Sequence, residues 1–348
     1  MAFALSSRSR RPRARTRQPS RAYTRPEPTR TRMRILLFLL ALLVAAPAVL
    51  AQGSHFRQKN IAEVIERRDG ALDDLPPVQY RYHVVEHESR LEARLKLYRY
   101  YGEENKGLLQ ILNRNDLENL RPGDTLIVPN DVTLDFRAYS PFPRYYPGAR
   151  DIDKVVILDK SIQAFAAYEW GKLMRWGMIN TGTESARTPS GRFNVNWKQD
   201  YRVSTLSPGY NNPEDGELWE MFWVMNIHEA RGIHLHQYAL PMGGPASHGC
   251  IRMSDPDARW LYAWTDTWDK TGGTDISSVG ATVHEPGTIV LVIGHDIVGT
   301  PSPFVYREDY PVIKRVVLPA SPYDVPPGSP QQERFDRLRV QQASNTRP

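Results

Sequence analysis

The chain has 348 residues, of which 41% are hydrophobic and 24% are charged, a composition that is ordinary for a globular protein and a length that allows two domains. Its net charge of +6 is unevenly distributed, because residues 1–34 hold eleven arginines and one acid, whereas the remainder has a net charge of −4. A nucleic-acid-binding protein should carry its basic residues over a folded face, so this distribution argues against that class of partner. The single cysteine, Cys250, excludes an intramolecular disulfide and a cysteine-rich zinc site.

An apolar run at residues 35–51 follows the arginines and ends before the polar residues 52–54. A positive start, an apolar stretch and small residues before a polar segment are the three parts of a secretory signal, so residues 1–51 are a leader with predicted cleavage before Gln52. Met33 is an alternative start. We expect an exported protein of the periplasm or cell envelope, anchored in the membrane if the apolar run stays uncleaved.

Residues 78–130 form a small α+β unit in which a strand, two helices and a second strand follow one another. The expected elements are a strand at 82–85, helices at 91–101 and 106–113, and, after a turn, a strand at 125–129. This order resembles a LysM module, a binder of peptidoglycan sugars. The matching residues are Tyr82 and Val84, 101–102, 112–113 and 120–129, whereas the first loop, residues 86–89, departs from the family's glycine-containing turn. A structural spacer of LysM shape is the alternative.

Residues 131–150 are rich in proline and aromatic residues and are typical of a packed linker, and residues 151–298 are predicted to form a β-rich domain. Its expected strands lie at 154–159, 163–168, 172–179, 220–227, 232–238 and 288–293. A helix should begin near Asp255, as N-cap, with Pro256 in its first position. The tail, residues 299–348, contains nine prolines from Thr300 onward and should be mostly irregular.

The candidate chemistry lies between residues 232 and 253, where three histidines occur within sixteen residues of Cys250. A thiol is nucleophilic as the thiolate, and a nearby imidazole can take its proton. His234 and His236 are two apart on an expected strand and therefore share one face. Gly249 permits a close turn that could aim backbone amides near Cys250 at a developing oxyanion.

Two other interpretations of these residues are weaker. Zinc ligation by the histidines and Cys250 lacks a carboxylate or a second thiol to complete a usual ligand set, so we predict no metal. Plain core packing is a poor fit, because the consecutive residues 247–250 are polar.

The same residues resemble the L,D-transpeptidase catalytic domain of the YkuD type. Residues 247–253, Ser-His-Gly-Cys-Ile-Arg-Met, fit its signature without a gap, and residues 188–193 match its Thr-Pro-x-Gly turn into a strand. Gly182 and the strand at 287–290 also fit. The resemblance covers about residues 151–295 and implies a mainly β fold, with a β-sandwich catalytic domain after the small α+β module.

The resemblance implies a cysteine transpeptidase that acts on peptidoglycan stem peptides without a cofactor. Cys250 would attack the carbonyl before the fourth-position D-Ala, expel D-Ala and form a thioester, which an amine of a neighbouring stem resolves into a 3→3 cross-link. His248 would shape the site, Ser247 and Gly249 would set the turn, and Arg252 could hold a substrate carboxylate. Carbapenems should acylate Cys250.

Several points stay open in the sequence. The base is His234 or His236, with the Ile-His-x-His pattern favouring His236. Water instead of an amine as acceptor would make the protein an L,D-carboxypeptidase or a cross-link-cleaving hydrolase, and an inert domain would leave a wall-binding protein. Glycan strands are a further partner if the LysM-like unit binds them, and the oligomeric state is undetermined. The segment 265–284 is a lid or a plain surface loop.

Overall fold

The structure of the chain, a computed structural model, describes residues 71–86, 89–240, 244–301, 305–306, 312–313 and 315–345. The arginine-rich leader and the apolar run at 35–51 lie outside these residues, so the predictions about export, cleavage and the start at Met33 stay predictions. Within the described ranges, no helix has the length and apolar character needed to span a membrane.

The first described region contains the predicted succession of strand, helix, helix and strand. Its elements are β1 (Tyr80–Val84), α2 (Arg90–Tyr101), α3 (Lys106–Asn113) and β2 (Thr125–Pro129). The two strands pair antiparallel, with Tyr82 opposite Ile127. The Asn113 side chain fastens α3 to β2, since it donates to the Ile127 carbonyl at 2.8 Å and accepts from the Ile127 amide at 2.7 Å. The resemblance of this region to a LysM module stays a prediction.

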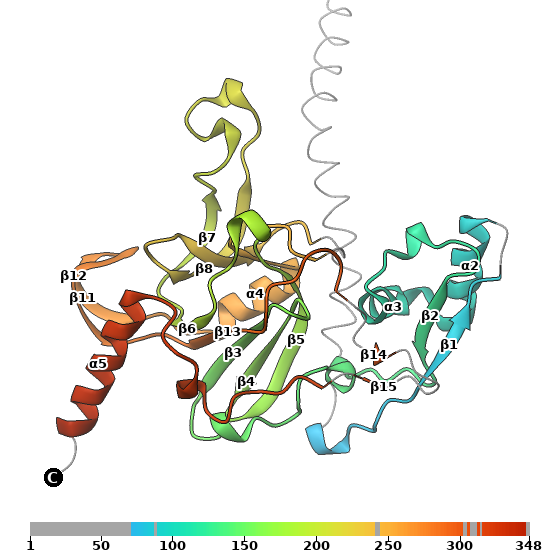
Figure 1. Cartoon of the computed structure of the whole chain (residues 1–348), viewed down its shortest axis with the longest axis horizontal. Helices are drawn as coiled ribbons and strands as arrows, with labels where there is room; N and C mark the ends of the chain where they lie inside the picture. Colours follow the sequence, from blue (N-terminus) through green and yellow to red (C-terminus); the bar gives the residue numbers. More distant parts are fainter. Residues whose placement is uncertain are drawn as a thin grey trace, which may run out of the picture. The chain divides into compact units, whose positions relative to one another are not determined.

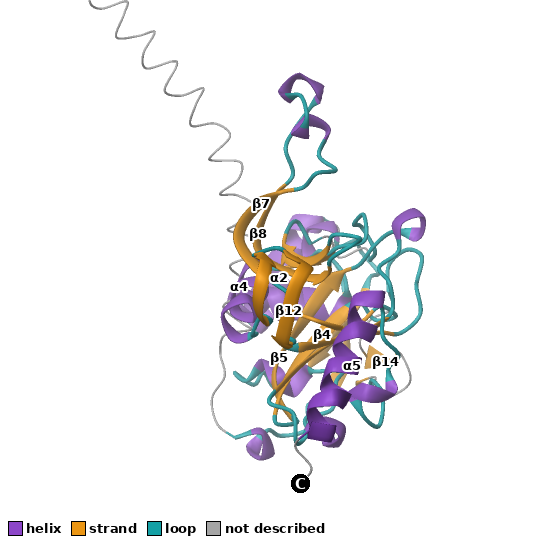
Figure 2. Ribbon diagram, turned by 90° about the vertical axis from the view of Figure 1, so that its left-hand side faces the viewer, coloured by secondary structure: helices purple, strands orange, loops and turns teal. Residues whose placement is uncertain are grey.

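Nine strands form one curled sheet in the order β6-β13-β3-β4-β5-β10-β9-β8-β7, and β7 and β8 bend away from β3–β5 (Figures 1 and 2). The strands are β3 (Lys154–Asp159), β4 (Ala164–Glu169), β5 (Lys172–Asn180), β6 (Gly191–Asn194), β7 (Lys198–Val203), β8 (Glu220–His228), β9 (Ile233–Gln237), β10 (Ile251–Met253) and β13 (Ile289–Ile293). The mainly β fold class is therefore confirmed. Short 3₁₀ turns are η1 (Leu72–Asp74), η2 (Glu103–Asn105), η3 (Leu117–Asn119), η4 (Phe136–Tyr139), η5 (Pro147–Ala149), η6 (Glu184–Ala186), η7 (Pro208–Tyr210), η8 (Pro213–Asp215) and η9 (Pro322–Asp324).

Both faces of the middle of the sheet are buried. Val155 and Ile157 of β3 pack in one core cluster, and Val156 and Leu158 pack in another, as expected from the alternation of side chains along a strand. The region 131–150 covers part of the first face, where the ring of Phe136 stacks on Trp176 of β5 with centroids 4.7 Å apart. A strand that is covered on both sides reads as a continuous apolar run, which explains the sequence of β3.

The loop that carries Cys250, the predicted nucleophile, joins β9 to β10 at residues 238–250 and is called the nucleophile loop below. β10 pairs parallel with β9, which places Arg252 opposite His236, and antiparallel with β5, which places Arg252 opposite Asn180. Because the two strands run in the same direction, the connection from the end of β9 must cross to the opposite end of the strands, where β10 begins, and Cys250 lies on it, directly before β10.

The helix after β10 is α4 (Asp255–Trp264), and its start differs by one residue from the prediction. Ser254, not Asp255, is the N-cap, because its hydroxyl accepts from the Asp257 amide at 3.4 Å, and Pro256 is the second helical residue. The Asp257 carboxylate accepts from Arg175 at 2.8 Å and from the Ser254 hydroxyl at 2.6 Å, which ties α4 to β5.

The segment 265–284 contains most of a hairpin, β11 (Asp269–Thr274) and β12 (Ser277–Glu285), whose strands pair antiparallel. The Glu229 carboxylate, in the turn between β8 and β9, accepts from the hydroxyls of Ser277 at 2.8 Å and Ser278 at 2.6 Å. The segment is therefore a fixed hairpin rather than a plain loop, and its residues do not line the cavity around Cys250.

The described part of the tail is not mostly irregular, unlike the prediction from its prolines. It contains the short strands β14 (Val305–Tyr306) and β15 (Val312–Ile313) and the helix α5 (Pro330–Asn345). Proline is tolerated at the first position of a helix, and no further proline follows before the end of α5. Arg192 of β6 donates to both oxygens of Asp336 at 2.6 and 2.8 Å, and Phe335 is buried against Trp197 and Met221.

Candidate active site

A cavity of about 200 Å³ opens around Cys250 and collects residues from four separate parts of the chain. Five of the residues singled out in the sequence besides Cys250 line it: His234, His236, Ser247, His248 and Arg252. The other lining residues are Arg202, Ser204, Thr205, Leu206, Trp219, Met221, Arg231, Gly232 and Tyr238. No local pattern in the sequence marks Arg202, Trp219 or Arg231, because they come from β7, β8 and their connections and meet the nucleophile loop only in the fold.

Cys250 carries a free, partly exposed thiol. Its Sγ lies 3.6 Å from the Gly232 carbonyl, to which it can donate. Burial raises the pKa of the Cys250 thiol, and a backbone hydrogen bond from His234 and the charges of Arg252 and Arg202 oppose this effect only in part. The resting form at neutral pH is therefore the thiol, which needs a base before it can act as a nucleophile.

His236 is buried in the tautomer that a base requires. Its Nδ1 lies 2.9 Å from the Gln237 carbonyl oxygen, and because a carbonyl only accepts hydrogen bonds, the proton of the neutral ring is on Nδ1. Nε2 then keeps its lone pair. Burial lowers the pKa of His236 to about 4, with the Gln237 carbonyl raising it and Arg252 lowering it by smaller amounts, so the ring is neutral at pH 7.

His234 has the opposite tautomer. Its Nδ1 lies 3.1 Å from Nδ2 of Asn226, an amide group that also faces the carbonyls of His228 at 3.4 Å and Ile233 at 3.3 Å. Those carbonyls fix which end of the Asn226 side chain is the donor, so His234 accepts at Nδ1 and carries its proton on Nε2. Burial, then the charges of His236 and Arg202, lowers the pKa of His234 to about 3.

A row of buried amides continues from His234 into the tail. Asn226 Oδ1 accepts from Nδ2 of Asn196 at 2.7 Å, and Asn196 Oδ1 accepts from Nε2 of Gln331 in α5 at 3.1 Å. Asn196 and Asn226 are each 1% exposed. The tail helix is thus linked to His234 by side chains that no pattern in the sequence connects.

The nucleophile loop is closed on itself by Ser247. Its hydroxyl donates to the Cys250 carbonyl at 2.5 Å and accepts from the Gly249 amide at 3.1 Å. Gly249 has φ +114°, a conformation that favours glycine, and a Cβ there would lie 3.0 Å from Cδ1 of Ile233. A hydrogen bond of 3.1 Å from the Ser247 amide to the Thr181 carbonyl connects the loop to the neighbouring segment after β5.

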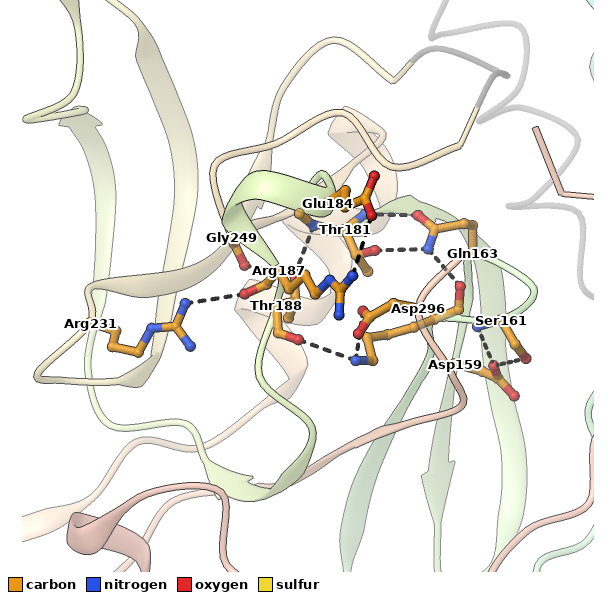
Figure 3. Close-up of polar contacts among 12 residues, drawn as sticks. Asp159, Ser161, Gln163, Thr181, Glu184, Arg187, Thr188, Arg231, Gly249 and Asp296 are labelled. Atoms are coloured by element: carbon orange, nitrogen blue, oxygen red, sulfur yellow. Dashed lines mark hydrogen bonds and ion pairs between the residues drawn. The ribbon is translucent and has the colours of Figure 1, made fainter. Parts of the chain in front are cut away.

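Thr188 ties the segment before β6 to this loop (Figure 3). Its Oγ1 donates to the Gly249 carbonyl at 2.8 Å and accepts from the Gly182 amide at 2.8 Å. The Thr188 carbonyl in turn accepts at 3.3 Å from Nζ of Lys160, a buried amine that pairs with Asp296 at 2.8 Å. The sequence marked Thr188 and Gly182 as motif matches without giving either a role.

The cavity is cationic and partly aromatic. Arg202, Arg231 and Arg252 line it, and none of its lining residues is acidic. The guanidinium of Arg252 lies over the Tyr238 ring, 4.7 Å from its centroid, and the exposed His248 ring stacks on Trp219 at 5.3 Å. Such a surface is suited to an anionic ligand. Among the described residues, no group of three His, Cys, Asp or Glu side chains is placed to hold a metal ion.

The L,D-transpeptidase catalytic domain, YkuD, matches residues 153–292. An L,D-transpeptidase from Mycobacterium smegmatis is 19% identical, with a TM-score of 0.31 over 40% of this chain and 58% of that one. L,D-transpeptidase 3 from Mycobacterium tuberculosis, solved with a faropenem-derived adduct, is 20% identical, with a TM-score of 0.30 over 40% and 60%. An L,D-transpeptidase from Stackebrandtia nassauensis is 20% identical, with a TM-score of 0.29 over 41% and 56%.

The chain thus spans less than two thirds of the length of these solved structures. No curated protein matches it. The family match covers the sheet from β3 to β13 and includes the nucleophile loop. Residues 153–292, less than half of the chain, therefore match the L,D-transpeptidase catalytic domain.

Proposed function

We propose that this protein is a cysteine L,D-transpeptidase that forms 3→3 cross-links in peptidoglycan through a thioester acyl-enzyme. The observation that carries the proposal is the pairing, in one cavity, of the Cys250 thiol with a neutral His236 whose Nε2 is unprotonated. The two groups supply a nucleophile and a base without an added cofactor or metal.

The reaction follows from these protonation states. His236 Nε2 takes the thiol proton as Sγ bonds to the carbonyl carbon before D-Ala, which gives a tetrahedral oxyanion. Collapse of the oxyanion breaks the C–N bond, and the D-Ala amine leaves with the proton from His236. The amine of an acceptor stem then attacks the thioester and passes a proton to His236. The C–S bond breaks, and the departing thiolate regains that proton.

The tautomers support His236 rather than His234 as the base. His234 accepts from Asn226 at Nδ1, so the proton on its Nε2 leaves no lone pair there to receive another. To act as a base through Nε2, His234 would first have to move that proton to Nδ1, against the donor group of Asn226. His236 needs no such rearrangement, because its Nδ1 already donates to the Gln237 carbonyl.

The charge of the cavity supports an acidic peptide as the substrate. Stem peptides carry free carboxylates, and Arg202, Arg231 and Arg252 offer guanidinium groups on the wall that holds Cys250. We assign Arg252 to a substrate carboxylate, Ser247 and Gly249 to the shape of the nucleophile loop, and His248 to the wall of the site. The signal-like leader favours action in the cell envelope, and the LysM-like unit favours glycan strands as a further partner.

The test is mass spectrometry of muropeptides after incubation of the purified chain with disaccharide-tetrapeptide, with Cys250→Ala as the matched control. A dimer that has lost one D-Ala, absent from the control, is the expected product. Tripeptide alone would show that water is the acceptor and that the enzyme is a carboxypeptidase. Unchanged substrate with both proteins would contradict the proposal and favour the wall-binding alternative.

A further inference from the structure

The hydroxyl of Thr188 holds the Gly249–Cys250 peptide from outside the nucleophile loop. Thr188 is 1% exposed, and its Oγ1 holds two hydrogen bonds of 2.8 Å, one from the Gly182 amide and one to the Gly249 carbonyl. A hydroxyl has a single proton. Because Gly182 donates to Oγ1, that proton is free to go to the Gly249 carbonyl, and the direction of the bond is fixed.

The direction of the Gly249 carbonyl decides where the Cys250 amide points. The peptide between them is trans, since the described residues contain no cis bond, and in a trans peptide the N–H points opposite to the C=O. With the carbonyl directed at Thr188, the N–H of Cys250 points away from Thr188, in the opposite direction within the peptide plane. No described residue accepts a hydrogen bond from this amide. It is a free donor on the nucleophile's own backbone.

Gly249 makes such a tie necessary. Its φ of +114° lies where glycine has wide freedom, so the Gly249–Cys250 peptide can rotate at little cost unless something outside the loop holds it. Ser247 contacts the peptides on either side, through the Gly249 amide and the Cys250 carbonyl, but not the Gly249 carbonyl. Thr188 supplies that contact from the segment between η6 and β6, as Figure 3 shows.

We propose that Thr188 is a positioning residue that fixes the Gly249–Cys250 peptide so that the Cys250 amide donates to the oxyanion of the tetrahedral intermediate. The inference rests on the proposed acyl transfer at Cys250. Thr188 itself touches neither substrate nor thiol. It acts by fixing the orientation of the Cys250 amide, which could otherwise rotate. Stabilisation of an oxyanion depends on hydrogen-bond donors that are oriented before the reaction.

The experiment compares two reactions of the same thiol in the full chain. Acylation by a carbapenem passes through an oxyanion, whereas alkylation by iodoacetamide does not. Both rates are followed by intact-protein mass spectrometry. Thr188→Val removes the hydroxyl and keeps the shape. We expect it to slow acylation by about tenfold to a hundredfold, less than the hundredfold to thousandfold of a lost oxyanion donor, because the Cys250 amide is still present but no longer held. Alkylation should be unchanged, and Thr188→Ser should restore acylation.

Thr183→Val is the matched control. Among the described residues, the Thr183 hydroxyl bonds with Ser185 alone, at 3.3 Å, and the variant keeps the bond of 2.9 Å from the Thr183 amide to the Ser247 carbonyl. Circular dichroism checks the fold of each variant. If Thr188→Val does not fold, Thr188→Ala removes the same hydroxyl without adding a methyl group in its place, and the same comparison applies.

The outcomes separate this inference from the proposed function. A wild-type protein that carbapenem does not acylate and that makes no muropeptide product would contradict the proposed function itself. A wild-type protein that is acylated, with Thr188→Val acylated equally fast, would overturn only the role of Thr188. Equal slowing of acylation and alkylation would also overturn it, since the variant would then disturb the thiol rather than the oxyanion donor.

Discussion

The buried imidazole of His236 predicts an enzyme that stays active in mild acid. As the base, His236 must be neutral, so activity is present above its pKa in the folded protein and is lost as the pH falls through it. An ordinary histidine with a pKa of about 6.5 is only about one-tenth neutral at pH 5.5. With its pKa lowered to about 4 by burial, His236 is almost entirely neutral at that pH. The rate constant for acylation at pH 5.5 should therefore be close to that at neutral pH, instead of about tenfold lower.

The assay is carbapenem acylation between pH 3.5 and 8, with circular dichroism at every pH. The second measurement is needed because the fold also loses stability in acid. The pKa values of His234 and His236 are about 3 and 4 in the folded protein, below the value of about 6.5 in the unfolded chain. The unfolded state therefore binds more protons, and stability falls as the pH drops below about 6.5. On the acid side of the pH profile, the acid limb, the acylation rate falls as the pH drops. A midpoint of this limb near pH 6, in protein that is still folded, would refute the assignment of a buried, neutral base.

Arg252→Gln offers a directional control for the same measurement. The charge of Arg252 lowers the pKa of His236, so its removal should move the acid limb to higher pH. The midpoint of the limb is the readout, because the variant can also weaken substrate binding and so change the rate at every pH. A midpoint that moves to lower pH would contradict the electrostatic argument.

Three further predictions concern single side chains. Cys250→Ala should abolish product formation and leave the melting temperature unchanged, and normal turnover would exclude the thiol mechanism. His236→Ala should lower kcat/KM by about 10²- to 10⁴-fold and His234→Ala by less, with the reverse order contradicting the tautomer argument. Asp257→Asn leaves the buried Arg175 without its carboxylate, since the two side chains are 1% and 3% exposed, and should cost about 3–5 kcal/mol in the free energy of unfolding measured by denaturant titration. A cost below about 1 kcal/mol, typical of a surface pair, would show that the pair is not buried as described.

The elements that the sequence predicted well are those in which local pattern and burial agree. β3 is a run of apolar residues because both of its faces are covered, and such a run needs no knowledge of its partners to be recognised as a strand. The cluster of Cys250, His234 and His236 could be predicted from the sequence for a related reason, because all three lie within one strand–loop–strand unit. Their shared cavity needs only the parallel pairing of β9 and β10.

What the sequence could not give depends on contacts between distant segments. Arg202 reaches the cavity from β7, and Trp219 from the connection between β7 and β8, which Figures 1 and 2 show as a long excursion from the sheet. The sequence also could not decide whether His234 or His236 is the base. Period-two alternation puts both on one face, whereas the tautomers are decided by the Asn226 side chain and the Gln237 carbonyl. The helix start shifted to Ser254 because adjacent Ser and Asp are both good N-caps.

The tail helix shows how a distant segment can adjoin the active site without controlling its chemistry. Gln331 donates to Asn196, and Asn196 donates to Asn226, which faces His234. Loss of α5 would remove the partner of the Asn196 carbonyl oxygen. Asn226 would still be oriented by two backbone carbonyls of β8 and β9, so His234 would keep its proton on Nε2. The amide row therefore couples the tail to the stability of the site, while the protonation states that serve catalysis are set within the sheet.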